Sequence, residues 1–167
     1  MDNENGRKIA HEMLPWLDAV YDVHPVYHDG SKFELPAMEE AKRLSKLYHL
    51  PVLYIHTRGA VNVWRTTIPT RRMWMEEFGE QWRKYFAICE TEKPRVACPF
   101  CDSDGETRYN GFVANTAAWE MVSLAPSADR MVYESLWKGK DVVVGTIIHS
   151  IDNDIHKIRK YLYRNYL

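Results

Sequence analysis

The stretch CETEKPRVACPFCDSDGETRYNGFV, residues 89–113, decides the fold that we expect for this chain. It holds all three cysteines, with Cys98 and Cys101 in a Cys-Pro-Phe-Cys turn and Cys89 nine residues upstream. The Asn110-Gly111 pair further on has the signature of a tight hairpin turn. We therefore expect a cysteine hairpin at about residues 89–113, inserted in a larger domain.

Outside this hairpin, apolar residues repeat at helical spacing more often than they alternate. Strands are expected at 52–56 and 60–68, joined as a hairpin, and at 142–149. Helices are expected over 8–22, 36–50, 70–87, 116–125 and 127–138, with a last helix after Asp152. Because βαβ alternation is not maintained, the order favours a mostly helical α+β fold with a small antiparallel sheet. Residues 1–7 are expected to be a disordered lead and residues 8–167 a single domain.

Composition excludes several classes of protein. The chain has 167 residues, a net charge of −1 and a pI of about 6.7, so a basic field over the whole molecule is absent. Six Trp and ten Tyr residues point to a recognition surface. No apolar run approaches the roughly 18 residues needed to span a bilayer, and the polar start does not resemble a signal peptide. With an odd number of cysteines, we expect a cytoplasmic protein without a membrane partner.

The run Val96-Ala97-Cys98-Pro99-Phe100-Cys101 resembles the first knuckle of zinc-ribbon proteins. The resemblance implies thiolate ligands held in a tight turn, although no second Cys-x-x-Cys follows. Cys89 is then a third ligand, and the fourth must come from a histidine or a carboxylate. We assign it to His156. His149 and His56 are left open as alternatives, and Asp102 and Asp104 are local but less usual zinc ligands. Such a zinc ion would be structural.

Two other readings of the cysteines stay open. In the first, all three are ordinary thiols, and Cys89 completes the apolar face of the helix before it. In the second, the Cys-Pro-Phe-Cys tetrad resembles that of glutaredoxins, which implies a redox pair. That resemblance is weakened because the tetrad lies in the second half of the chain and lacks a partner cis-proline loop.

Basic residues alternate with tryptophans around the helix at 70–87. Arg65, Arg71, Arg72 and Trp74 form a candidate surface that binds phosphates and stacks on bases. In the opposing reading, the tryptophans are buried in the hydrophobic core and the arginines lie on the solvent-exposed side of the helix. We expect a small zinc-stabilised binding protein that recognises nucleic acid or a nucleic-acid-associated protein. Chains of this kind are common among regulatory and viral host-interaction proteins.

The alternative function is a histidine-dependent hydrolase or phosphoesterase. His56 and His149 each end an expected strand and precede a hydroxyl residue, so they can serve as acid and base in one cleft. The pattern is loosely similar to that of two-histidine phosphoesterases. Because no phosphate loop, nucleophile elbow or dinucleotide fingerprint is present, an enzyme is the less favoured expectation.

Overall fold

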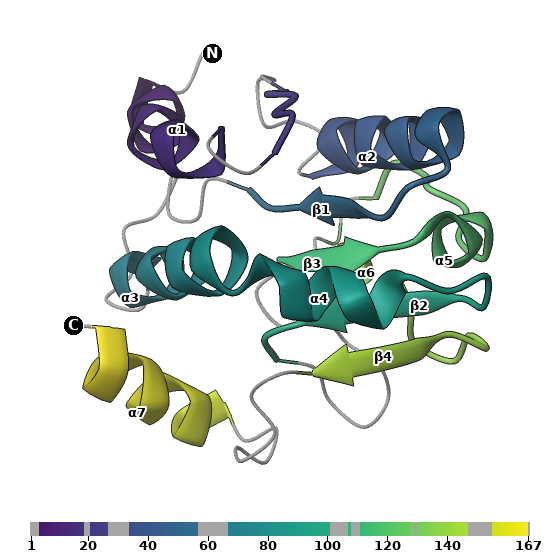
Figure 1. The fold of residues 1–167 in the computed structure, drawn as a ribbon. Coiled ribbons are helices and arrows are strands. Elements are labelled where there is room, and N and C mark those ends of the chain that lie inside the picture. Colours follow the sequence, from purple (N-terminus) through teal and green to yellow (C-terminus); the bar gives the residue numbers. More distant parts are fainter. Residues whose placement is uncertain are drawn as a thin grey trace.

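A four-stranded sheet forms the centre of the molecule (Figure 1). The structure is a computed structural model, and it describes residues 4–18, 21–26, 34–56, 67–100, 107, 111–127, 129, 131–146 and 155–166. The strands are β1 (Val52–Tyr54), β2 (Arg95–Cys98), β3 (Phe112–Ala114) and β4 (Val143–Thr146). They lie in the order β1-β3-β2-β4.

The direction of the strands brings three strand ends to the same edge of the sheet. β3 is antiparallel to both of its neighbours, with Val113 opposite Leu53 on one side and Ala97 on the other. β4 runs parallel to β2. β1, β2 and β4 therefore run in one direction, and the arrowheads of β1 and β4 point to the side occupied by α1, α3 and α7 (Figure 1).

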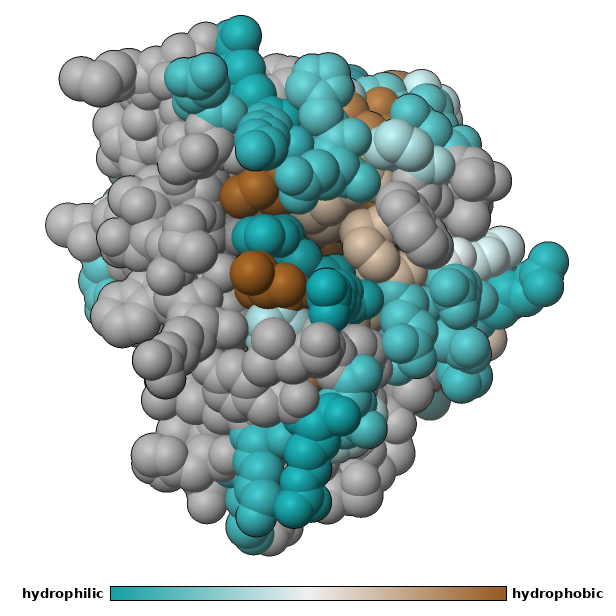
Figure 2. All heavy atoms as spheres, turned by 90° about the vertical axis from the view of Figure 1, so that its left-hand side faces the viewer, coloured by the Kyte–Doolittle hydropathy of each residue, from teal (hydrophilic) through white to brown (hydrophobic). Residues whose placement is uncertain are grey.

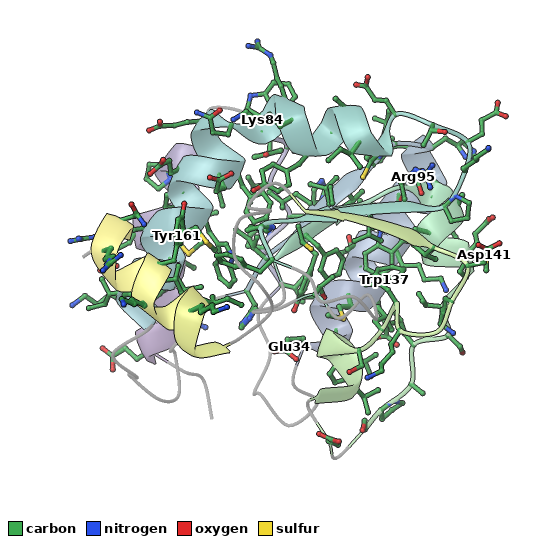
Figure 3. All side chains as sticks on the ribbon, turned by 90° about the horizontal axis from the view of Figure 1, so that it is seen from below. Glu34, Lys84, Arg95, Trp137, Asp141 and Tyr161 are labelled. Atoms are coloured by element: carbon green, nitrogen blue, oxygen red, sulfur yellow. The ribbon has the colours of Figure 1, made fainter. Side chains whose placement is uncertain are left out.

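Helices cover both faces of the sheet. They are listed in chain order: α1 (Glu4–Leu17), α2 (Leu35–Tyr48), α3 (Thr67–Trp74), the π-helix η1 (Met75–Glu80), α4 (Trp82–Cys89), α5 (Thr116–Glu120), α6 (Met131–Glu134) and α7 (Ile155–Tyr166). Seen along the sheet, Lys84 on α4 and Trp137, which follows α6, lie on opposite sides of it (Figure 3).

Two hydrophobic cores result from this layering. Ala97 and Val113 belong to the first core, together with residues of α1, α3, η1, α4 and α7. Val96 and Phe112, their neighbours in sequence, belong to the second core with residues of α2, α5 and the α6 region. Successive side chains of a strand point to opposite faces, and every residue of β3 is buried. A sheet covered on both faces needs such continuously apolar strands.

The α+β class expected from the sequence is confirmed, since helices surround a small sheet in which β1, β3 and β2 are antiparallel. The parallel strand β4 differs from the expectation. The expected strand at 60–68 falls mostly outside the described residues, but its last two residues, Thr67 and Ile68, begin α3 instead. The first helix starts at Glu4, earlier than residue 8, so the expected lead is partly helical.

The expected helix at 70–87 is found, but it is longer and irregular. It starts at Thr67, changes to π-helical geometry at Met75, and is interrupted at Gln81 before α4. π-helical turns are rare and often accompany functional sites. Within the described ranges, no helix is long and apolar enough to cross a bilayer.

Candidate functional site

The two described cysteines lie in different cores. Cys89, the last residue of α4, belongs to the first core, and Cys98, the last residue of β2, belongs to the second. Both are buried. The two side chains therefore lie on opposite faces of the sheet, and the predicted zinc ion that they share stays a prediction.

Cys89 has the properties of a core residue. Its thiol is 1% exposed and approaches the main-chain oxygen of Val113 at 3.5 Å and that of Arg95 at 3.8 Å. Burial raises the pKa of this thiol to about 12, so it stays protonated at neutral pH. In this structure Cys89 therefore packs as a core thiol, and its predicted role as a metal ligand stays a prediction.

The other predicted ligands are placed less completely. Cys101 lies outside the described residues, and His156 is the second residue of α7, of whose side chain nothing is described. Phe100 makes an edge-on contact with Tyr161 of α7 at a centroid distance of 6.2 Å, which brings α7 against the cysteine turn. Among the residues that the structure describes, no group of three possible metal ligands is found. Zinc at this turn stays a prediction.

Trp74 is not a stacking surface. Its ring is 1% exposed and lies in the first core, so it cannot receive a base in this structure. Of the predicted arginines, Arg65 lies outside the described residues, Arg71 is half-buried and Arg72 is exposed. Because α3 starts at Thr67, both arginines lie beyond its first turn rather than at its N-terminus.

Two helices in contact form a basic face. α3 packs against α7, and neither helix contains an acidic residue. We name this the α3/α7 basic face; its cationic positions are Arg71, Arg72, Lys157, Lys160 and Arg164. It belongs to the side of the molecule shown in Figure 2, where hydrophilic side chains occupy much of the described surface. Such a face attracts polyanions.

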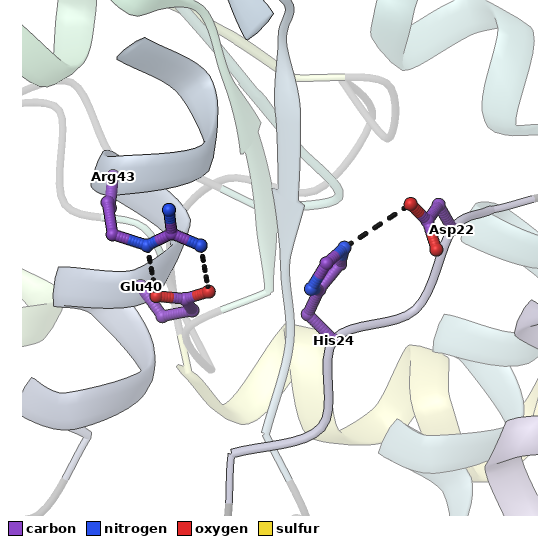
Figure 4. Close-up of polar contacts among 4 residues, drawn as sticks. All are labelled: Asp22, His24, Glu40 and Arg43. Atoms are coloured by element: carbon purple, nitrogen blue, oxygen red, sulfur yellow. Dashed lines mark hydrogen bonds and ion pairs between the residues drawn. The ribbon is translucent and has the colours of Figure 1, made fainter. Parts of the chain in front are cut away.

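A second cluster lies where β1 ends. His56 Nε2 is 4.0 Å from Glu34 Oε1, and only 19% of the imidazole side chain and 9% of the carboxylate side chain are exposed. A similar pair is His24 with Asp22 at 3.3 Å, which Figure 4 shows together with the ion pair of Glu40 with Arg43. Because the Asp22 side chain is 90% exposed, water screens that pair. Glu34 and His56 are therefore the stronger candidates for chemistry.

Aromatic rings surround His56. Tyr54 stacks on the imidazole at 6.4 Å, and Trp74 meets it edge-on at 5.4 Å between centroids. Trp74 is held in place beside Gly111, where an added Cβ would lie 2.6 Å from the indole nitrogen. The ring stack fixes the imidazole where the two cores meet, since Tyr54 belongs to one core and Trp74 to the other.

The predicted pairing of His56 with His149 stays a prediction. β4 ends at Thr146, and His149 lies outside the described residues. Among the residues that the structure describes, Glu34 is a carboxylate that lies beside His56.

Sequence reasoning missed Glu34. An acidic residue just before a helix is common because the helix dipole favours it, so Glu34 carries no distinguishing signal. Comparisons of the chain with protein families, with curated proteins and with solved structures found no match.

Proposed function

We propose that the protein binds nucleic acid through the α3/α7 basic face. The observation that supports the proposal is the charge of this face. Two helices in contact supply five described cationic positions and contain no acidic residue, although the whole chain is nearly neutral. Phosphate contacts by Lys and Arg provide most of the affinity of sequence-independent binding.

The spacing on α7 suits a phosphate backbone. Lys157, Lys160 and Arg164 are exposed and recur at i, i+3 and i+7, which places them on one side of the helix over about two turns. Ile158 and Leu162 are fully buried on the other side. The buried side fixes α7 to the first core, and the cationic side faces away from that core.

Fluorescence anisotropy with a labelled 20-nucleotide RNA and a labelled 20-base-pair DNA tests the proposal. We expect Lys160→Gln with Arg164→Gln to weaken binding at least tenfold. The matched control is Lys46→Gln with Lys140→Gln, which removes the same charge from exposed positions outside the α3/α7 basic face. If both double variants weaken binding equally, the loss reflects the net charge of the protein and not the α3/α7 basic face, and the proposal is refuted. It is also refuted if Lys160→Gln with Arg164→Gln binds as tightly as the wild type.

We further propose that zinc on Cys98 and Cys101 stabilises the cysteine turn, with His156 as a further ligand. The contact of Phe100 with Tyr161 supports this, because it joins the turn to the helix that bears His156. Elemental analysis of the purified protein is the test. We expect near-stoichiometric zinc that Cys101→Ser abolishes and Cys89→Ser leaves in place. A wild-type protein without zinc would refute the proposal.

A further inference from the structure

We propose that Glu34 and His56 form an acid–base site that cleaves RNA by activating its 2′-hydroxyl group. The inference rests on the proposed binding of nucleic acid by the α3/α7 basic face. It adds a substrate class and a reaction to that function.

The separation of the two groups is the first argument. His56 Nε2 and Glu34 Oε1 are 4.0 Å apart. This separation is too long for a direct hydrogen bond between them. One oxygen atom placed to the side of the pair can lie within hydrogen-bond distance of both. The pair is thus spaced to hold a hydroxyl group or a water molecule between its two members.

The surroundings of the pair are the second argument. Glu34 occupies the N-cap position of α2, but its carboxylate does not cap the helix. The charge is stabilised there by the N-terminal end of the helix dipole. Because both side chains are largely buried, the carboxylate stabilises a protonated imidazole more strongly than it would in water. The imidazole is the more exposed member and is the one that a substrate reaches first.

The position of the pair is the third argument. His56 follows the carboxyl end of β1, two residues after Tyr54. Trp74 of α3 contacts His56. Arg71 precedes Trp74 by three residues and so lies on the same side of α3. α3 therefore joins the acid–base pair to the basic face.

RNA is the substrate that this arrangement favours, because its nucleophile is already next to the phosphorus. The neutral His56 imidazole takes the proton of the 2′-hydroxyl, and the Glu34 carboxylate stabilises the imidazolium. The bond between the 2′-oxygen and phosphorus forms as the bond from phosphorus to the 5′-oxygen breaks. The departing 5′-oxygen takes a proton from solvent, and His56 later returns its proton. The products are a 2′,3′-cyclic phosphate and a 5′-hydroxyl end.

The experiment follows cleavage of a labelled single-stranded RNA on denaturing gels, with the same strand in 2′-deoxy form as a control. We expect the wild-type protein to cut only the RNA and to leave cyclic phosphate ends. His56→Phe keeps a ring between Tyr54 and Trp74, and Glu34→Gln keeps the shape of the side chain. General acid–base catalysis is typically worth 10² to 10⁴ in rate. We therefore expect losses of at least about 100-fold in His56→Phe and a smaller loss in Glu34→Gln.

Matched controls are His11→Phe and Glu39→Gln, which alter exposed residues of α1 and α2. Circular dichroism and RNA affinity are measured for every variant. RNA that is bound but not cut by the wild-type protein overturns this inference and leaves the proposed function intact. Binding of DNA without RNA does the same, whereas absence of binding to both nucleic acids overturns both proposals. Cutting that persists in folded His56→Phe, or cutting of the deoxy strand, also overturns the inference.

Discussion

The side-chain amide of Asn115 donates a hydrogen bond of 2.8 Å to the main-chain oxygen of Lys93. The same nitrogen reaches the carbonyl oxygens of Thr91 at 2.8 Å and Cys89 at 3.3 Å. Its side-chain oxygen accepts from the main-chain nitrogens of Arg95 at 3.1 Å and Ala118 at 3.0 Å, the second of which caps α5. One buried side chain thus donates to three carbonyl oxygens of the turn between α4 and β2.

Replacing Asn115 by Ala is therefore expected to destabilise the protein strongly. Loss of an N-cap typically costs about 0.5–2 kcal/mol, and each buried polar group left without a partner about 1–3 kcal/mol. We expect the free energy of unfolding to fall by about 3 kcal/mol in urea titrations. The control is Asn165→Ala at an exposed position in α7, where a substitution should leave stability almost unchanged. Similar losses of stability in Asn115→Ala and Asn165→Ala would contradict the role of Asn115 as the buried link between this turn and α5.

Gly111 is expected to tolerate no side chain. A Cβ there would lie 2.6 Å and 2.8 Å from two atoms of the Trp74 indole and 3.1 Å from the Phe78 ring, and both rings are buried. Overpacking of this kind typically costs about 1–3 kcal/mol. We expect Gly111→Ala to lower the thermal midpoint, whereas Gly79→Ala, where nothing lies within 4 Å of the added carbon, should not. A Gly111→Ala protein as stable as the wild type would show that Trp74 can move away.

Cys89 is expected to make the protein sensitive to alkaline pH. Burial raises the pKa of its thiol from an ordinary value of 9.0 to about 12. Between these values the unfolded chain loses a proton that the folded chain keeps, so stability falls as pH rises above 9, by up to about 1.4 kcal/mol per pH unit. Burial also raises the pKa of Tyr21, which acts in the same direction at higher pH.

Urea midpoints between pH 7 and 11 measure this effect. Cys89→Ala lowers stability at every pH, but its stability should fall less steeply than that of the wild type above pH 9. Parallel curves for the two proteins would refute the role of Cys89. As an independent check, a Cys98→Ser, Cys101→Ser protein should not react with a thiol reagent at pH 8 until it is unfolded.

The salt dependence of nucleic-acid binding should report directly on α7. Each phosphate contact contributes about 0.9 to the slope of log affinity against log salt concentration for duplex DNA, and about 0.7 for single strands. Losing Lys160 and Arg164 should therefore reduce the slope by about 1.4–1.8. If the double variant keeps the wild-type slope, Lys160 and Arg164 do not contact phosphates, even if the affinity of the variant is lower than that of the wild type.

The helices were largely predictable because they rest on local patterns. Trp74, Phe78 and Tyr85 recur at helical spacing and are all buried, which agrees with the reading of the tryptophans as core and not with the reading of Trp74 as a stacking surface. Ile158 and Leu162 likewise share the buried side of α7. The order of the strands was not predictable in this way, since Tyr54 pairs with Phe112, far along the chain.

The candidate site depends on long-range packing too. Cys89 and Cys98 are close in sequence, but α4 lies over one face of the sheet and the pleat of β2 turns Cys98 to the other face. A histidine at the end of β1 was visible from the sequence as a candidate. Its partner Glu34 was not, because the pairing forms only when α2 packs against β1.

The central place of β3 has a consequence for synthesis on the ribosome. β1 and β2 have no common neighbour until Phe112–Ala114 has left the exit tunnel, because β3 lies between them. Until then β1 can pack only against helices such as α2 and α3, and the apolar side chains of both cores stay partly exposed to water. Exposed apolar surface of this kind makes a nascent chain prone to aggregate.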